Sequence, residues 1–166
     1  STSRDVTERK RHQEELRKAQ SLLLAAVEQS PAGILIADAP DVRIRMANAA
    51  ALGIRGEASV LLTDIPAEHH PANWQVYHPD GTPFKPEDLP LSQAILQDKV
   101  ARNVDAVVRR SSGEDRWILA NAAPVHNSSG NIIAGVVVFL DITELKQAEQ
   151  ELHFRSRFEK LLSEIS

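Results

Sequence analysis

The side chains best suited to chemistry in this chain are its six histidines, because the sequence contains no cysteine. Without cysteine, thiol nucleophiles, thiolate zinc sites, iron–sulfur ligation and disulfides are all excluded. His69 and His70 are adjacent, and neighbouring residues on a helix or strand rarely face one metal ion. We therefore expect no metal site there, and predict that these two histidines, like His78 and His126, lie exposed in loops.

Catalytic motifs are also missing. The sequence has no glycine-rich dinucleotide loop, no P-loop, no HExxH zinc motif and no GxSxG elbow. His12 and His153 fall in charged helical segments, outside the histidine–acid run with following Asn and Pro that marks a phospho-accepting kinase helix. The sequence predicts that this chain is not an enzyme.

Composition and charge narrow the class of protein further. The 166 residues are 42% hydrophobic, a length and apolar content suited to one folded domain with attachments. The net charge of −4 gives no electrostatic footprint for nucleic acid. No apolar run approaches the roughly 20 residues of a membrane span, and no signal peptide opens the sequence. These features predict a soluble, cytoplasmic protein that neither binds nucleic acid nor inserts into a membrane.

Two charged helical segments bracket the middle of the chain, from about Thr7 to Ser30 and from about Thr143 to the end. Each carries apolar residues in the 3-4 spacing of a heptad stripe, which favours pairing of helices. Near Phe154 the stripe of the second segment changes phase, which suggests a connector that ends and another helix that begins. The stripe positions are Leu16, Ala19, Leu23 and Ala26 in the first segment, and Leu145, Ala148 and Leu152 in the second.

A short internal repeat links the two segments. Asp5-Val6-Thr7-Glu8 recurs as Asp141-Ile142-Thr143-Glu144. One interpretation is two helix starts that share an ordinary capping box. The other is a true repeat within a longer tandem protein, favoured by further identities at the same spacing. These identities pair Lys10 with Lys146, Glu15 with Glu151, and Leu16 with Leu152.

The region between the helices predicts a mixture of helices and antiparallel strands. Short apolar or alternating runs predict a hairpin, and three later strands with short turns predict a meander, so the class is α+β. Between Thr63 and Pro90 the sequence is rich in proline and favours irregular backbone with short helical turns. The expected strands are 34–38, 42–46, 102–110, 115–125 and 131–141, and the expected helices are 47–52 and a longer one from Asp88 or Ser92 to about Asp98.

This order of elements resembles the PAS domain family over residues 22–143. The resemblance rests on ordered motifs: Glu28–Ile34, Met46–Ala50, His78–Pro83, Arg109–Gly113, Trp117, Ala123–Val125, Gly130–Ile132 and the exit motif Asp141-Ile142-Thr143. It implies a PAS fold, with a five-stranded antiparallel sheet in the order 2-1-5-4-3 and helices on one face around a small cavity. Residues 1–21 would then be a connector helix from an upstream domain, and residues 144–166 a connector helix to a downstream domain.

The resemblance also suggests where a small organic ligand would bind. Predicted inward faces and matching family positions give a candidate cavity lining of Ile36, Asn48, Trp74, Tyr77, Val107, Trp117, Asn121 and Phe139. Trp117 and Phe139 have an alternative role as plain core, since large aromatic residues dominate core packing. Asn48 has an alternative role as a helix cap, and Asn121 needs a hydrogen-bond partner if it faces inward.

Cofactors are left open by the sequence, with two restrictions from the family. Light-responsive PAS domains that bind flavin use a reactive cysteine, which this chain lacks, so cysteinyl–flavin photochemistry is excluded. Haem-binding PAS domains use a proximal histidine on the longer helix, and the segment from Leu89 to Asp98 contains none. Haem is therefore not expected, and the ligand, if there is one, is unknown.

The exit motif predicts how a signal would leave the domain. The Asp141 carboxylate can accept backbone N–H groups at the next helix start, and the Thr143 hydroxyl can add a second cap. A strand joined to a helix in this way would pass a distortion of the sheet to Leu145 and Leu152 on that helix. The leading hypothesis is a sensory and dimerisation module of a bacterial-type signalling protein, such as a histidine kinase, that forms a homodimer through its flanking helices and contacts neighbouring domains. The alternatives are a ligand-free spacer and a haem-binding gas or redox sensor.

Overall fold

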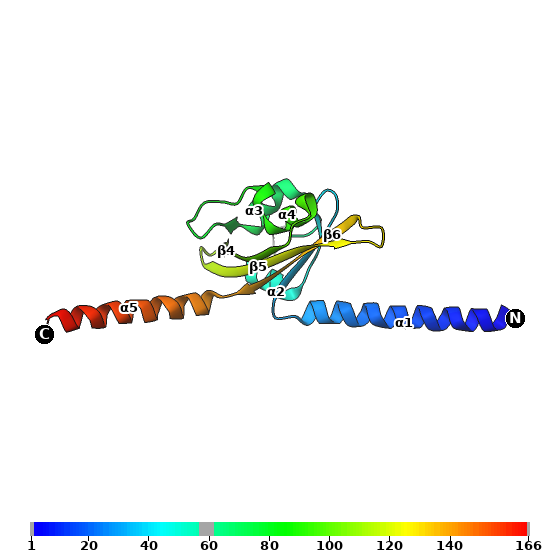
Figure 1. Ribbon diagram of the computed structural model, residues 1–166, viewed down its shortest axis with the longest axis horizontal. Helices are drawn as coiled ribbons and strands as arrows, with labels where there is room; N and C mark the ends of the chain where they lie inside the picture. Colours follow the sequence, from blue (N-terminus) through cyan, green and yellow to red (C-terminus); the bar gives the residue numbers. More distant parts are fainter. Residues whose placement is uncertain (1, 57–61, 166) are drawn as a thin grey trace.

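The computed structural model describes residues 2–56 and 62–165 of the chain as a curled sheet with a long helix at each end (Figure 1). The helices are α1 (Thr2–Gln29), α2 (Ala49–Arg55), α3 (His70–Trp74), α4 (Pro90–Gln97) and α5 (Thr143–Ile165), with 3-10 turns at Ala67–His69 and Pro86–Asp88. The strands are β1 (Gly33–Asp38), β2 (Arg43–Ala47), β3 (Val76–Tyr77), β4 (Ala101–Arg109), β5 (Asp115–His126) and β6 (Ile132–Asp141).

All neighbouring strands pair antiparallel in the order β2-β1-β6-β5-β4-β3. If the two-residue β3 is set aside, this is the predicted order 2-1-5-4-3, so the predicted α+β PAS fold is confirmed. The sixth strand, β3, lies at the edge beside β4, where Val76 pairs with Val108 and Tyr77 with Val107. It comes from the proline-rich stretch in which only irregular backbone and helical turns were predicted.

The short turns that join β4 to β5 and β5 to β6 each contain a glycine with positive φ, Gly113 and Gly130. In the β5–β6 turn, the Asn127 side-chain oxygen accepts hydrogen bonds from the backbone N–H groups of Ser129 and Asn131, both at 3.0 Å. Gly130 follows with φ of 83°, a left-handed conformation that glycine adopts without steric cost. Such turns hold the three long strands in one meander.

Two glycines allow bulky groups to come close to the sheet. A Cβ at Gly33 would lie 2.4 Å from the ring of Phe139, which is its cross-strand partner in β6. A Cβ at Gly135 would lie 2.6 Å from the Ile95 side chain of α4. The first glycine makes room for an aromatic ring, and the second lets α4 lie directly against β6.

The hydrophobic core lies between one face of the sheet and the segment from α3 to α4 (Figure 1). Alternate strand residues point into it, including Leu35 and Ala37 of β1 and Val137 and Phe139 of β6. Helix α4 supplies Leu91, Ala94 and Ile95, a spacing that places them on one side of the helix. This packing closes the layer above the sheet and positions the cavity described below.

The two long helices leave the core in opposite directions (Figure 1). The stripe residues named above are exposed on both, and the part of α1 from residue 3 to residue 26 is exposed throughout. Helix α5 runs without interruption past the predicted phase change near Phe154, so the separate second helix expected there was wrong. Helix α1 is likewise continuous across residues 21 and 22, and the domain boundary there stays a prediction.

Within the described residues, none of the helices combines the length and apolar character needed to cross a membrane.

Candidate functional site

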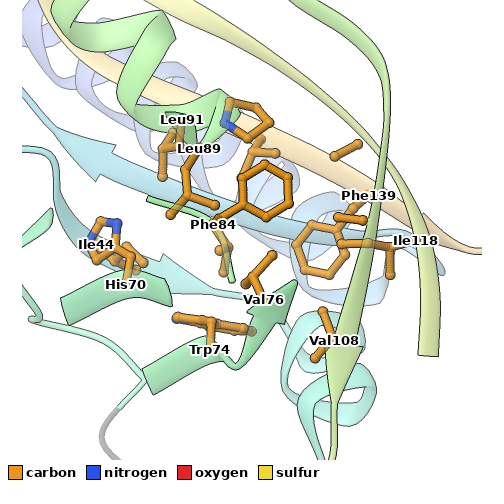
Figure 2. A pocket seen from close by; sticks show the side chains of 15 residues that line it. Ile44, His70, Trp74, Val76, Phe84, Leu89, Leu91, Val108, Ile118 and Phe139 are labelled. Atoms are coloured by element: carbon orange, nitrogen blue, oxygen red, sulfur yellow. The ribbon is translucent and has the colours of Figure 1, made fainter. Parts of the chain in front are cut away.

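A small apolar cavity of about 70 Å³ lies between the sheet and the segment from α3 to α4 (Figure 2). The sheet supplies side chains from all six of its strands, and the opposite wall comes from α3, α4 and the loop between them. The lining residues are Leu35, Ile44, Val76, Ala106, Val108, Ile118, Ala120, Val137 and Phe139 from the sheet, and His70, Trp74, Phe84, Leu89, Pro90 and Leu91 from the opposite wall.

Two polar side chains border this cavity, and both are held by backbone carbonyls. Nε2 of His70 lies 3.0 Å from the carbonyl oxygen of Ile65, and the Nε1–H of Trp74 donates to the carbonyl of Leu62 at 3.1 Å. Burial lowers the pKa of His70 below its ordinary value, despite the carbonyl hydrogen bond, which acts in the opposite direction. The site therefore presents a neutral imidazole and otherwise hydrocarbon surface.

His70 was predicted to lie exposed in a loop, and that prediction was wrong: the residue is 2% exposed. It begins α3, and Pro71 follows it at the first turn, where proline is favoured. This proline was the available signal that a helix starts here, while the direction of the His70 side chain is set by the packing of α3 against the core.

Trp74 and Phe139 are the two predicted lining residues that line the cavity. Their rings meet edge to face, with centroids 6.5 Å apart and an angle of 79° between the planes. Figure 2 shows both rings pointing into the same space. Each is also buried in the core, so the alternative role of Phe139 as a core residue is compatible with its place in the cavity wall.

Five other predicted residues lie outside the cavity, because the inward face of their strands was assigned one residue out of step. The residues that line the cavity from the same strands are Leu35, Val76, Ala106, Val108, Ile118 and Ala120. Adjacent strand residues point to opposite faces, so their neighbours point away. The predicted lining residues corrected in this way are Ile36, Tyr77, Val107, Trp117 and Asn121.

Three of these five form one row on the outer face of the sheet. Val107 pairs with Tyr77 on one side and with Trp117 on the other. The guanidinium of Arg109 lies 4.4 Å from the Tyr77 ring centroid, and Nζ of Lys146 lies 5.9 Å from that of Trp117. The row reaches the start of α5, which carries Lys146.

Asn121 is also on the outer side of the sheet and is exposed. Its side-chain oxygen accepts a hydrogen bond from the backbone N–H of Asn103 at 3.1 Å. Ala101 pairs with Ala122, and the register between β4 and β5 shifts before Val104. The partner that the sequence demanded for Asn121 is thus a backbone group of the neighbouring strand.

Asn48 is fully buried and joins three elements rather than lining the cavity. Its oxygen accepts hydrogen bonds from the N–H groups of Ala51 at 3.0 Å, which caps α2, and of Ile34 at 2.9 Å, at the start of β1. Its nitrogen donates to the carbonyls of Val27 at 2.7 Å and Ala32 at 2.9 Å. The predicted capping role is confirmed, and the same amide holds the end of α1 against the core.

The exit motif is a dense polar junction between the sheet and α5. One oxygen of Asp141 accepts the backbone N–H of Thr143 at 3.0 Å and its hydroxyl at 2.6 Å. The other oxygen accepts from the guanidinium of Arg116 at 2.7 and 2.8 Å. Arg116 also pairs with Glu114 at 2.8 Å. The predicted acceptor role of Asp141 is confirmed, and Arg116 is a junction residue that sequence reasoning missed.

Thr143 acts differently from the prediction. Its hydroxyl accepts the backbone N–H of Trp117 at 2.9 Å and donates to Asp141, so it ties α5 to β5 instead of adding a second cap to the helix. Burial opposes ionisation of Asp141, but hydrogen bonds from Thr143 and Arg116 outweigh it and hold the pKa of that carboxyl below its ordinary value. The junction thus contains an ion pair between Arg116 of β5 and the ionised carboxylate of Asp141 at the end of β6.

Leu145 and Leu152 lie beyond this junction on α5, 57% and 65% exposed. The remaining histidines do not converge on one point: His69 is exposed, His78 stacks on Phe84 and His126 pairs with Asp98 at 2.9 Å. Among residues 2–56 and 62–165, no three His, Asp or Glu side chains are grouped as they would be around a metal ion.

Comparison with known proteins agrees with this geometry. The family model described as PAS fold matches residues 27–147. The chain is similar to the solved structure of an RNA-binding light-oxygen-voltage receptor, with a TM-score of 0.58 and 22% identity over 83% of this chain, although it spans only 37% of that one. It is also similar to the PAS domain of an HTR-like protein from Haloarcula marismortui (TM-score 0.56, 20% identity, 80% of this chain and 99% of that chain).

A third similar structure is the PAS domain from Bordetella pertussis BvgS, with a TM-score of 0.51 and 17% identity over 84% of this chain and 98% of that one. No curated protein matches the sequence. At these identities the structures support the fold, while the family model covers most of the chain, from the end of α1 through the exit motif. The chain belongs to the PAS fold family of sensory domains.

Proposed function

We propose that this chain is a sensory and dimerisation module that relays a signal through α1 and α5 to neighbouring domains of a bacterial-type signalling protein. The observation that carries the proposal is the junction at Asp141 and Thr143. It fixes α5 to β5 and β6 at once, so that a change in the curl of the sheet would change the direction of the helix.

The exposed stripe of α5 supports a role in pairing. Leu145, Ala148 and Leu152 are exposed at heptad spacing, and Thr143 is the buried residue of this helix within the described part of the chain. Hydrophobic side chains at such positions pack against a second helix in coiled coils. A homodimer through the flanking helices, with transmission by a shift of their packing, is the arrangement we propose.

The cavity supports a small, largely apolar ligand as the signal. Its volume of about 70 Å³ is well below the roughly 300 Å³ at which pockets for drug-sized ligands begin. Neither a flavin nor a haem fits this space, and the imidazole of His70 is already hydrogen-bonded to Ile65. The same small volume favours a second candidate function, a ligand-free spacer that passes on signals from the upstream domain.

The remaining parts of the proposal rest on family resemblance. We propose that this chain has no catalytic activity of its own, that it functions in the cytoplasm and that the output domain is a histidine kinase. The PAS fold of the chain and the absence of catalytic motifs from its sequence support the first of these.

Light scattering of the full chain at about 100 µM tests the pairing, because the population of a dimer depends on protein concentration. We expect a dimer, and we expect the double variant Leu145→Glu, Leu152→Glu to be a monomer. The matched control is Gln147→Glu, Gln150→Glu, which adds the same charge to the exposed part of α5 outside the stripe and should stay dimeric. A monomeric wild-type chain would remove dimerisation from the proposal.

Native mass spectrometry separates the sensory module from the spacer. A small molecule that copurifies with the wild-type chain, and is lost when the cavity is filled by Ala120→Leu, supports sensing. A wild-type mass equal to that of the bare polypeptide, from several expression hosts, favours the spacer. An absorption spectrum without a Soret band after addition of haem excludes the haem sensor.

A further inference from the structure

The sequence at the end of α5 repeats Glu28, a residue by which α1 joins the core. When the two exit motifs are aligned, the identities continue past the motif itself to the far end of each helix. A capping box explains only the first few of them. The identical pairs that matter for contacts are Asp5 and Asp141, Thr7 and Thr143, Glu28 and Glu164, and Ser30 and Ser166.

Glu28 attaches the end of α1 to the core of this domain, and Ser30 lies in the turn that follows the helix. The Glu28 carboxylate accepts a hydrogen bond from the backbone N–H of Ala49, the first residue of α2, at 3.0 Å. A carboxylate is favoured at this end of a helix, where the backbone N–H groups lack partners. The Ser30 hydroxyl oxygen accepts from the N–H of Ala32 at 3.2 Å, just before β1.

The repeated positions are thus concentrated where the helices meet a domain. Asp141 and Thr143 join the sheet to α5, Glu28 joins α1 to α2, and Ser30 fixes the turn between α1 and β1. Between these ends the side chains of α1 from residue 8 to residue 26 are exposed, and matches there are sparse. A requirement for helix formation alone would not select the same residues at both contact points.

We propose that α5 is the first helix of a second domain of this same fold, which follows in the same chain, and that Glu164 accepts the first backbone N–H of that domain's short helix. By the same correspondence, Asp5 and Thr7 in α1 are the exit motif of a preceding domain. Glu164 is exposed on α5, as a residue that awaits such a contact must be. This inference goes beyond the proposed function and needs neither the dimer nor the ligand.

A segment exchange within the full chain tests the proposal. In one chimaera, residues 7–30 are replaced by the sequence of residues 143–166; in the matched control, they are replaced by residues 142–165, one position out of register. Val27, the partly buried side chain near the end of α1, is kept in both. We expect the first chimaera to melt within about 2 °C of the wild type, and the control to melt about 3 °C lower or more, because it misplaces the glutamate that caps α2.

A second substitution tests the contact itself. Glu28→Ala in the wild type and the equivalent change from glutamate to alanine in the first chimaera should lower the melting temperature by the same amount, about 2–4 °C. Equal melting of the two chimaeras would overturn the proposal, as would failure of the first chimaera to fold. The proposal would also be overturned if the alanine substitution lowered the melting temperature of the wild type but not that of the first chimaera. These readouts are independent of oligomeric state when measured in dilute solution.

Discussion

The carboxylate of Asp141 illustrates how much of this junction depends on one side chain. One of its oxygens serves the first turn of α5 and the other serves the guanidinium of Arg116. Hydrogen bonds to a charged group are worth about 1.5–3 kcal/mol, roughly twice the worth of neutral ones. An amide of the same shape could keep at most part of this arrangement, because its nitrogen is a donor that faces donors.

Asp141→Asn should therefore lower the free energy of unfolding by about 2 kcal/mol, measured by urea denaturation near neutral pH. Because the folded-state pKa of Asp141 is depressed, its contribution is present above the ordinary value of 3.8 and is lost as pH falls through the folded-state pKa. The wild type and the variant should thus converge in stability at low pH. The control is Asp38→Asn, which breaks an exposed pair with Arg45 and should cost less than about 1 kcal/mol.

His70 should also make the stability of the domain depend on pH, but at a higher pH than Asp141 does. Its folded-state pKa lies below 6.5, so the unfolded chain binds the proton more readily. Stability is then full above about pH 6.5 and declines as pH falls from there toward the folded-state pKa.

His70→Gln replaces the imidazole by an amide that can still donate to the carbonyl of Ile65 but cannot titrate. Denaturation followed by tryptophan fluorescence at about pH 7.5 and pH 5.5 should show a smaller decline for the variant than for the wild type. The exposed His12 provides the control, since His12→Gln should leave the decline unchanged. An equal decline in all three proteins would show that other groups cause it.

At the scale of the elements, the long strands could be predicted from the sequence, but their inward faces could not. The turns at Gly113 and Gly130 marked the meander, and the strand bounds agree within about two residues. Alternation, however, identifies a face only when the other face is polar. In β4 the neighbours Val107 and Val108 are both apolar and both buried, so hydrophobicity could not tell which one reaches the cavity.

The shorter elements could not be predicted from the sequence for a different reason. Strand β3 has only two residues, too few for any period, and it forms because β4 offers an edge beside it. His70 and Phe84 reach the cavity through tertiary packing of the segment around α3 and β3, which no local pattern encodes. Phe139 was among the candidates because it occupies a matching position in the family, since both faces of β6 are apolar and alternation alone could not single it out.

The close contact of Gly33 with Phe139 gives a prediction about β1 and β6. Gly33→Ala would place a methyl group within 2.4 Å of the ring, so the ring must move into the cavity or the strands must part. Overpacking of this kind costs about 1–3 kcal/mol in unfolding free energy. Chemical denaturation should show this loss, and the double variant with Phe139→Leu should regain part of it.

Gly53 in α2 is the matched control, because no atom lies within 4 Å of the position its Cβ would take. Gly53→Ala should be neutral or stabilising by up to about 1 kcal/mol, as expected for alanine in a helix. A loss of stability at Gly53 as large as that at Gly33 would contradict the steric explanation.

At the scale of the whole molecule, the core and the long helices are nearly separate in their contacts. Helix α1 touches the core only near its end, through the Val27 carbonyl and the Glu28 carboxylate. Residues 3–21 are exposed throughout. The stability of the core therefore should not depend on most of α1.

Removal of residues 1–21 should leave the melting temperature within about 2 °C of the full chain, measured in dilute solution, where pairing contributes little. Removal of residues 1–29 also deletes the contact of the Val27 carbonyl with Asn48 and that of Glu28 with α2. This truncation should lower the melting temperature by about 4 °C or more. If both truncations melt alike, the junction at Asn48 does not stabilise the fold. If the shorter truncation already destabilises the core, the predicted boundary at residue 22 is wrong.

Helices α1 and α5 extend from opposite sides of the core (Figure 1), which has a consequence for the symmetry of a dimer. Both helices run in the same sense, α1 toward the core and α5 away from it (Figure 1). In the parallel homodimer proposed above, one two-fold axis could run beside both helices, with the two cores on opposite sides of it. An input that arrives along such an axis can turn the output helices as a torque, without moving either core from its place beside the axis.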